Sequence, residues 1–361
     1  SAYQSLAAWS VGSPYDLGTT KLNNGAKPSR NSNPNLKWET TQQTDLGFDM
    51  GFFNNKIGLT FDNYKKTTHD LLYSKLVPYY TGYTDYVTNI GSVENRGNEI
   101  GVDTRQRVRA IDIRLGGNIA WNRSKVLDLG GDKEFFLDGV NGSLPTFRPA
   151  AIVRVGEPLG NFFGYIWDGI FQTAAEAAAS GQSGAVAGGM KLRDVNGDGK
   201  ITTDDRVILG NAQPKYTVGQ NGFFGWRALS LSYVLRAVEG NKVVNLNRQG
   251  METPGDNVNT LRNTLNYWTP GSGINNMTGI GIGPFNAMTS RWVEDGSFVR
   301  LQNVTLGWDV PQRFVRHVNV GNLRVYGSAQ NLKTWTKYSW YDPEASSRGT
   351  SDLQLGWDDS S

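Results

Sequence analysis

The residues with the most specific chemistry lie in the segment DVNGDGKITTDD, residues 194–205. Oxygen-bearing side chains stand at positions one, three and five, glycine stands at position six, and a carboxylate stands at position twelve. This is the spacing of a calcium-binding loop, in which the glycine permits a sharp bend. The predicted ligands of one Ca²⁺ are Asp194, Asn196, Asp198, the carbonyl oxygen of Lys200, and Asp205.

The flanks of this loop differ from those of a calcium sensor. SGAVAGGMKL precedes it and VILGNAQPKY follows it, and such glycine-rich and proline-containing segments do not form helices. Calcium sites in extracellular modules bind at about 10⁻⁴ to 10⁻³ M. We therefore expect a structural ion, with the shorter Asp205 binding through one oxygen or through water. A metal-free turn rich in Asx and glycine is the alternative.

The composition narrows the class of protein. The chain of 361 residues has 44 glycines, 11% aromatic residues, two histidines and no cysteine, which favours β-structure and leaves no disulfide or thiolate metal site. A net charge of +3 without a basic stripe argues against nucleic acid as a partner. No carboxylate pair or base-activated nucleophile stands out, so we do not expect an enzyme.

Hydrophobic residues alternate with polar ones in several segments. In IDIRLGGNIAW, residues 111–121, the apolar side chains fall on one face, and the same alternation recurs at 45–52 and 229–235. Each such strand has roughly the 9 to 11 residues that cross a bilayer when tilted. No apolar run of about 18 residues predicts a membrane-spanning helix.

The connections alternate in length. FFNNK, QRVRAI, FFGWR and VPQRFVRHVNVGN link strands tightly, whereas long segments occupy about residues 70–94, 126–214, 240–296 and the tail after Trp335. Short turns on one side and long loops on the other are typical of an outer-membrane β-barrel with extracellular long loops. Near the short turns lie aromatic residues that would suit an interfacial girdle: Phe52, Phe53, Phe223, Phe224, Trp226 and Trp308. A soluble β-sandwich is the alternative.

Smaller signals occur within the long segments. Thr173 and Glu176 have the spacing of a capping box and predict one short helix. GIGIGPFN, residues 279–286, lacks the lysine and the helix of a phosphate loop and is interpreted as an irregular loop. Several loop aromatics, which suit sugar stacking or packing within the loops equally well, are Tyr79, Tyr80, Tyr83, Trp167 and Trp340.

Six segments, taken in order, resemble one family. They are NPNLKWETT (33–41), NIGSVENRGNEIGV (89–102), GYIWDGIFQ (164–172), DVNGDGKITTDDRVILGNAQPKY (194–216), WVEDGSFVRLQNVTLGW (292–308) and LRVYGSAQNLKTWTKYSWYDPE (323–344). Together they are similar to the C-terminal half of SusC/RagA-type TonB-dependent outer-membrane transporters.

The resemblance implies an all-β protein with an antiparallel transmembrane β-barrel. Family members carry a TonB-contacting segment and a plug ahead of a barrel of about 22 strands, so residues 1–361 are interpreted as about eight C-terminal strands of a longer polypeptide. Residues 126–214 would be a long extracellular loop carrying the calcium motif. The implied partners are a SusD-like lipoprotein, TonB, the plug, the rest of the barrel and the lipid bilayer.

Two functions fit these observations. The first is a part of an outer-membrane importer of oligosaccharides or peptides. The second is a calcium-stabilised extracellular binding or adhesion module without transport. The strand faces discriminate between them, because a lipid-facing strand keeps large apolar residues at every second position through about 25 Å.

Overall fold

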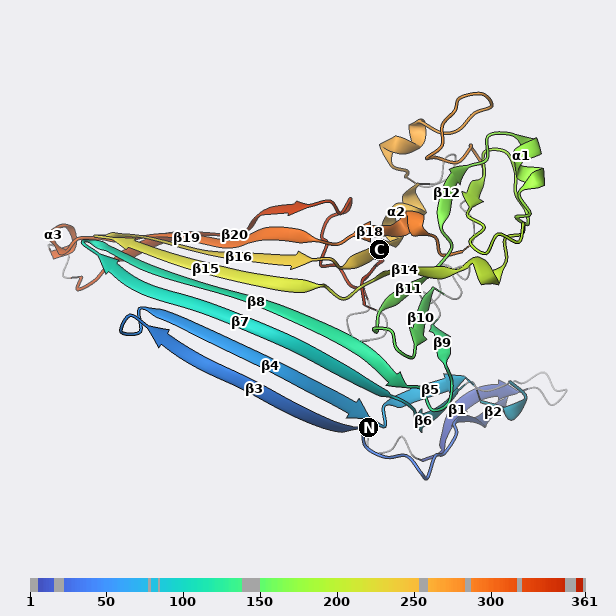
Figure 1. Ribbon diagram of the computed structural model, residues 1–361, viewed down its shortest axis with the longest axis horizontal. Coiled ribbons are helices and arrows are strands. Elements are labelled where there is room, and N and C mark those ends of the chain that lie inside the picture. The colour runs from blue at the N-terminus through green and yellow to red at the C-terminus, as the bar shows by residue number, and fades with distance from the viewer. Residues whose placement is uncertain are drawn as a thin grey trace.

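The largest element is one antiparallel sheet of eight strands in the order β20-β19-β16-β15-β8-β7-β4-β3. In this computed structural model the described residues are 6–15, 23–76, 79–83, 85–137, 150–252, 259–282, 287–316, 320–347 and 355–359. The eight strands are β3 (Thr40–Phe52), β4 (Ile57–His69), β7 (Ser92–Val108), β8 (Ile111–Asp128), β15 (Tyr216–Trp226), β16 (Leu229–Glu239), β19 (Phe298–Asp309) and β20 (Arg324–Thr336). Long, curved strands lie side by side in Figure 1. The eight-stranded sheet confirms the predicted all-β class and the predicted number of strands.

The four tight connections all lie at one end of this sheet (Figure 1). They comprise residues 53–56, 109–110, 227–228 and 310–323, and the last contains the one-turn helix α3 (Gln312–Val315). Two of the tight links predicted from the sequence, QRVRAI and FFGWR, include residues that belong to the strands. Residues 106–108 and 223–226 continue their strands in register, so only Arg109–Ala110 and Arg227–Ala228 form the turns.

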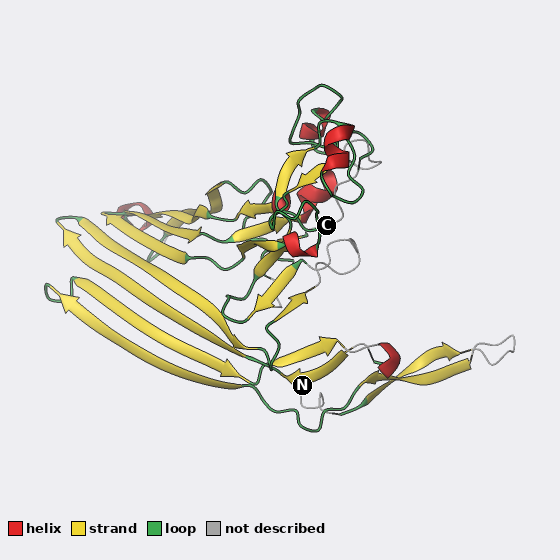
Figure 2. Cartoon of the chain, turned by 45° about the vertical axis from the view of Figure 1, so that its right-hand side comes forward, coloured by secondary structure: helices red, strands yellow, loops and turns green. Residues whose placement is uncertain are grey.

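The long connections gather at the opposite end of the sheet, where they form a separate layer (Figure 2). We call this the loop layer; it comprises the described residues outside the eight strands and their tight turns. Its strands are β1 (Ala8–Tyr15), β2 (Asn23–Arg30), β5 (Leu72–Leu76), β6 (Asp85–Asn89), β9 (Glu134–Leu137), β10 (Ala151–Arg154), β11 (Asn161–Gly164), β12 (Trp167–Ile170), β13 (Met190–Leu192), β14 (Val207–Asn211), β17 (Lys242–Asn245), β18 (Val293–Asp295) and β21 (Trp357–Asp358). Its helical turns are α1 (Ala174–Ala179), α2 (Leu246–Met251), η1 (Tyr79–Thr81), η2 (Thr203–Asp205), η3 (Arg262–Leu265) and η4 (Ser290–Trp292).

The main apolar core lies in the loop layer. Phe162, Trp292 and Trp357 are at most 2% exposed, and the rings of Phe162 and Trp357 meet edge to face at a centroid distance of 5.5 Å. Because these residues come from distant parts of the sequence, their packing fixes the long connections against one another. The part of the loop layer that contains these residues is therefore packed around its own core, to which β1 and β2 contribute no buried residue.

The short helix predicted from Thr173 and Glu176 is confirmed. Thr173 precedes α1, and its hydroxyl accepts a 3.1 Å hydrogen bond from the backbone N–H of Glu176. The Glu176 carboxylate in turn accepts from the backbone N–H of Gln172 at 2.7 Å. Among the described residues, no helix has the length and apolar character needed to cross a bilayer.

Candidate functional site

The eight-stranded sheet has two chemically different faces. Phe61, Ile100 and Ile119 are cross-strand partners in one row, and Leu231 is the partner of Leu306 in another. Since alternate residues of a strand share a face, the register places the apolar sets predicted at 45–52, 111–121 and 229–235 on one common side. We call this side the apolar face and the other side the polar face.

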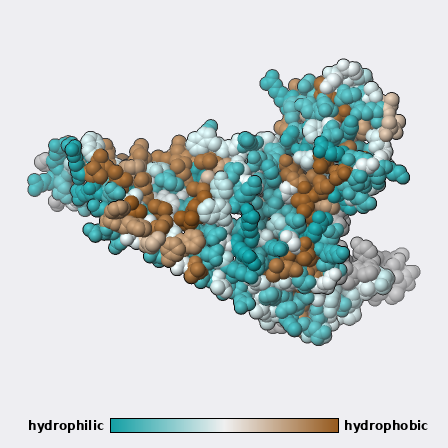
Figure 3. Space-filling model, in the orientation of Figure 1, coloured by the Kyte–Doolittle hydropathy of each residue, from teal (hydrophilic) through white to brown (hydrophobic). Residues whose placement is uncertain are grey.

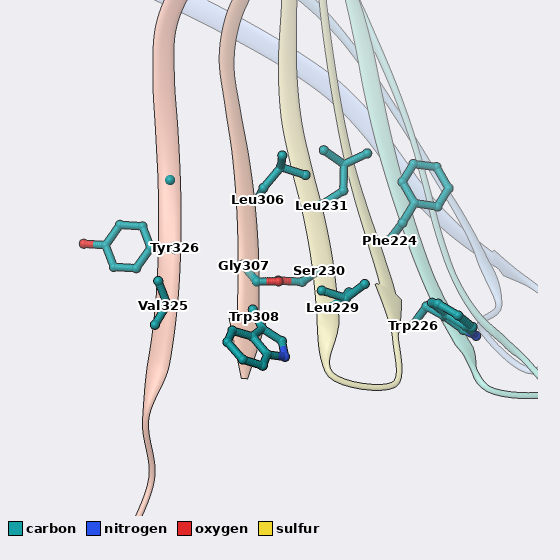
Figure 4. Close-up of a pocket in the computed structure, with 11 residues that line it drawn as sticks. Phe224, Trp226, Leu229, Ser230, Leu231, Leu306, Gly307, Trp308, Val325 and Tyr326 are labelled. Carbon is teal, nitrogen blue, oxygen red and sulfur yellow. The ribbon is translucent and has the colours of Figure 1, made fainter. Parts of the chain in front are cut away.

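The apolar face carries a shallow groove of about 760 Å³ near the short turns (Figure 4). Its lining is almost entirely hydrophobic and includes Phe224, Trp226, Leu229, Leu231, Leu306 and Trp308. Leu229 is 51% exposed and Leu306 is 62% exposed. In Figure 3 the hydrophobic surface forms a band over the strands, beside a hydrophilic tip. A contiguous apolar surface of this kind requires a covering of lipid or protein.

The aromatic residues near the short turns divide between the two faces. Trp226 and Trp308 belong to the apolar groove, as expected for a girdle. Phe223 lies on the polar face, where the guanidinium carbon of Arg114 is 4.9 Å from its ring centroid. Grouping Phe223 with Phe224 was therefore wrong, because consecutive strand residues point to opposite sides.

The polar face presents charged and hydrogen-bonding side chains. Arg114 forms a 2.6 Å ion pair with Asp112, and the hydroxyls of Thr305 and Ser328 are 2.9 Å apart. Several polar side chains occupy the space beside glycines of the next strand. At Gly219, for example, an added Cβ atom would fall 2.4 Å from Asn118 Oδ1, so the Asn118 side chain occupies the place that a larger residue would fill. This face can line a water-filled path and exchange hydrogen bonds with a passing polar solute.

The calcium-type loop lies in the loop layer between β13 and β14 and folds around its own backbone. Asp194 Oδ1 accepts from the N–H of Gly197 at 2.6 Å, and Asp194 Oδ2 accepts from Gly199 at 2.8 Å. Asn196 Oδ1 accepts from Asp198 at 2.9 Å, and Asp198 Oδ1 accepts from Lys200 at 2.8 Å. Gly199 has φ +79°, the left-handed conformation that favours glycine at this bend.

Asp205 is fully buried and organises both ends of the loop. Its Oδ1 accepts from Val195 at 2.8 Å and its Oδ2 accepts from Thr202 at 2.8 Å, which caps the short helix η2. Burial on its own would raise the pKa of Asp205, but the hydrogen bonds from the backbone N–H groups of Thr202, Val195 and Asn196 outweigh it and hold the pKa below its ordinary value. The carboxylate is therefore ionised at neutral pH.

The donor set of the loop fits a hard cation such as Ca²⁺, since every predicted ligand offers oxygen. Each carboxylate oxygen that accepts one N–H keeps a second lone pair. Asp194, Asp198 and Asp205 place three carboxylates in one loop of twelve residues, and carboxylates that come close together repel each other unless a proton or cation lies between them. Across the described residues, however, no three His, Cys, Asp or Glu side chains converge as a metal cluster. Calcium binding by Asp194, Asn196, Asp198, Lys200 and Asp205 stays a prediction.

A buried charge network in the loop layer has no counterpart among the sequence predictions. The Glu252 side chain is fully buried and accepts from Arg248 Nε and Arg291 Nη2, each at 2.8 Å. Burial lowers the pKa of Arg291, although the negative charge of Glu252 acts in the opposite direction. The spacing of Arg248 and Glu252 on one helical turn is a sequence signal for this pair, but the contribution of Arg291 is visible only in three dimensions.

The loop aromatics have different environments. Tyr80 is 90% exposed. Trp167 is partly buried, with Nε1 donating to the carbonyl of Gly169 at 2.8 Å and the Arg291 guanidinium 4.7 Å from its ring. The side chain of Tyr79 and residues 283–286 of GIGIGPFN lie outside the described residues. Trp167 thus serves packing within the loop layer, and Tyr80 is free to meet a ligand or partner.

Comparison with known proteins identifies the family to which the chain belongs. The family described as "TonB dependent receptor-like, beta-barrel" matches residues 3–332. The chain is 32% identical over 351 residues to TonB-dependent receptor P3 of Formosa agariphila, covering 96% of this chain and 34% of that protein. It is 27% identical over 330 residues to TonB-dependent receptor SusC of Bacteroides thetaiotaomicron, covering 87% of this chain and 30% of SusC.

Solved structures share the fold. The RagAB peptide importer in its closed-closed state superposes with a TM-score of 0.76 at 25% identity, covering 98% of this chain and 37% of that one. A structure of the RagAB peptide transporter gives a TM-score of 0.77 at 23% identity, with the same two coverages of 98% and 37%. The chain thus spans about a third of the length of the relatives that it matches.

Proposed function

Because the chain belongs to the TonB-dependent receptor-like β-barrel family, we propose that it forms part of the barrel wall of an outer-membrane importer of oligosaccharides or peptides. The observation that carries this proposal is the division of one eight-stranded sheet into an apolar face and a polar face. Lipid covers the first face, and the second borders the path of the solute. Energy comes from TonB acting on another part of the importer.

The substrate classes follow from chemistry and from relatives. Short polar and charged side chains, such as Asn118 and Arg114, offer hydrogen bonds to hydroxyl and amide groups alike. The related structures are those of a peptide importer, and SusC is a TonB-dependent receptor of the same family. A SusD-like surface lipoprotein is the proposed partner, and it meets the loop layer at the end of the sheet opposite the short turns.

An uptake experiment tests the transport proposal. Cells expressing the complete protein are supplied with labelled oligosaccharides or labelled peptides, with and without a functional TonB. We expect accumulation of one substrate class only when both the protein and TonB are present. Accumulation that is independent of TonB, or cell adhesion without uptake, contradicts the proposal.

The orientation is tested separately by epitope tags. A tag at residues 271–273, in the loop layer, should be reached by antibody on intact cells, whereas a tag in the turn 53–56 should be reached only after the outer membrane is opened. The opposite labelling pattern would place the loop layer on the periplasmic side and exclude contact with a surface lipoprotein.

A structural calcium ion completes the proposal. Asp194, Asn196, Asp198, the Lys200 carbonyl and Asp205 would hold it within the loop layer. The cation would neutralise adjacent carboxylates and keep the loop closed. Its expected role is to hold the outer surface in one shape for the lipoprotein partner, without any part in chemistry.

A further inference from the structure

A row of cationic side chains crosses three neighbouring strands of the sheet. Lys65 of β4 is the cross-strand partner of Arg96 of β7, and Arg96 is the partner of Arg123 of β8. Lys125 follows two residues later on the same side of β8. Like charges directly opposite each other on a sheet are unfavourable, so this row needs a counter-charge.

The protein supplies only part of that counter-charge. The nearly buried carboxylate of Glu94 contacts Lys65 at 3.0 Å and Arg96 at 2.5 Å. Within the described part of the chain, neither Arg123 nor Lys125 forms an ion pair, and both are exposed. Four cationic groups therefore share one carboxylate. Lys125 is the cross-strand partner of Glu94, whose carboxylate is already engaged by Lys65 and Arg96, so both cations on β8 have donors to offer an added anion.

The same residues border a hollow of about 480 Å³. Arg96, Arg123 and Lys125 lie on its wall together with Glu94, and Trp121 forms part of the same lining. The hollow thus offers donors and space in one place, next to an aromatic ring. Its size suits a phosphate group with part of the sugar to which it is attached.

The position of the hollow relative to the apolar face identifies the source of the phosphate. Cationic and apolar residues share one side of the sheet, in three successive rows. The first row is apolar and consists of Phe61, Ile100 and Ile119. Towards the loop layer it is followed by Asn63, Asn98 and Trp121, and then by Lys65, Arg96 and Arg123. Successive rows are about 7 Å apart along the strands. Tryptophan favours the edge of the hydrocarbon layer, so the cations lie at the level of lipid head groups.

We propose that Arg96, Arg123 and Lys125 form a binding site for the phosphate group of an anionic glycolipid in the leaflet that surrounds the loop-layer end of the barrel. The lipid's acyl chains lie along the apolar face, and its phosphate neutralises the cation row. Guanidinium groups suit this role because they bind phosphate oxygens through paired N–H donors. The site anchors the barrel at a fixed depth in the membrane. This inference rests on the proposed function, which sets the sheet in the outer membrane.

Binding to the complete protein in detergent micelles tests the site. The probe is bisphosphorylated lipid A, compared with the same lipid A after removal of its phosphates and with inorganic phosphate. We expect Arg123→Gln with Lys125→Gln to weaken binding of bisphosphorylated lipid A by on the order of five-fold for each cation removed. Lys66→Gln is the matched control, because Lys66 adjoins Lys65 but points to the polar face; its affinity should equal that of the wild type.

A second variant distinguishes anion binding from a structural role. Glu94→Gln removes the competing carboxylate, so affinity for bisphosphorylated lipid A should rise. Equal binding of dephosphorylated lipid A, unchanged binding in the double variant, or saturation by inorganic phosphate without any binding of lipid A would overturn the assignment. The uptake assay tests the proposed function independently of the lipid site. Lipid A binding without TonB-dependent uptake would reject the importer but not the lipid site. Uptake without lipid A binding would reject the lipid site alone.

Discussion

The hydroxyl of Tyr338 donates a 2.5 Å hydrogen bond to the carboxylate of Asp358, and both residues are buried. Asp358 Oδ1 also accepts from Asn247 Nδ2 at 2.9 Å. Burial and the neighbouring Asp358 raise the pKa of Tyr338, so the hydroxyl remains a donor at every physiological pH. This contact ties residues 355–359, including β21, to α2 and to the end of β20.

Removing that donor should loosen the segment 355–359. Tyr338→Phe leaves a buried carboxylate with one fewer partner, at a cost of about 1.5 to 3 kcal/mol for a hydrogen bond to a charged group. Hydrogen exchange of the backbone amides at 355–359 should become faster while that of the eight-stranded sheet stays unchanged. Tyr341→Phe is the control, since Tyr341 is 91% exposed; equal effects of the two variants would refute the role of this contact.

The difference between the sheet and the loop layer explains what could be predicted from the sequence. A strand with one apolar face imposes a period of two on its own residues, so 111–121 shows its structure without reference to any other segment. Pairs such as Tyr338 with Asp358, or Phe162 with Trp357, join residues whose separation follows no local period. Their contacts depend on the path of the whole loop and could not be read from spacing.

The calcium-type loop shows a second limit of sequence reasoning. The spacing from Asp194 to Asp205 correctly places a glycine-dependent bend and a ring of side-chain oxygens. The same spacing also suits a carboxylate that caps the backbone, and Asp205 does this through Val195 and Thr202. Metal ligation and capping demand the same residue types at the same positions, so the sequence does not separate them.

The two faces of the sheet predict unequal tolerance of charge. Leu115 lies on the apolar face, paired with Gly222, and Asn118 lies on the polar face, paired with Gly219. Leu115→Arg should lower the free energy of unfolding in lipid vesicles by about 2 to 4 kcal/mol near the midplane, since the charge must enter lipid. Asn118→Arg should have a much smaller effect. Urea titration of the complete barrel measures both, and equal losses would contradict the assignment of the faces.

Two turns carry arginine in a conformation that favours glycine. Arg109 and Arg227 both have φ +54°, and each begins a two-residue connection. Arg109→Gly should raise the free energy of unfolding by about 1 kcal/mol, because the strain of a left-handed non-glycine residue is relieved. Arg227→Gly should raise the free energy of unfolding by less, because the Arg227 guanidinium lies 5.3 Å from the Trp226 ring centroid and this stabilising contact would be lost. Urea titration ranks the variants, and destabilisation by both would show that the turns are not strained.

Acid should open the calcium-type loop through Asp205. The folded-state pKa of this carboxyl lies below its ordinary value of 3.8, so its stabilising effect is present above that value and is lost as pH falls through the folded-state pKa. Protease cleavage within 190–210 should therefore be unchanged from neutral pH down to about pH 5 and should rise only in stronger acid. Asp205→Asn should be cleaved faster at neutral pH, whereas Asp204→Asn, an exposed neighbour, should behave like the wild type.

Removing two predicted ligands should separate calcium binding from the folding of the barrel. Asp194→Ala together with Asp198→Ala deletes two carboxylates, so Ca²⁺ should be lost and the segment 190–210 should become sensitive to protease. Barrel stability should be retained, because the ladder hydrogen bonds of the sheet do not pass through this loop. Asp204→Ala removes a carboxylate that is not a predicted ligand and should retain the ion. Metal analysis and limited proteolysis, each with and without chelator, distinguish a calcium site from a metal-free turn. If the wild-type protein holds no Ca²⁺ at millimolar concentration, or if chelator leaves its cleavage unchanged, residues 194–205 form a metal-free turn.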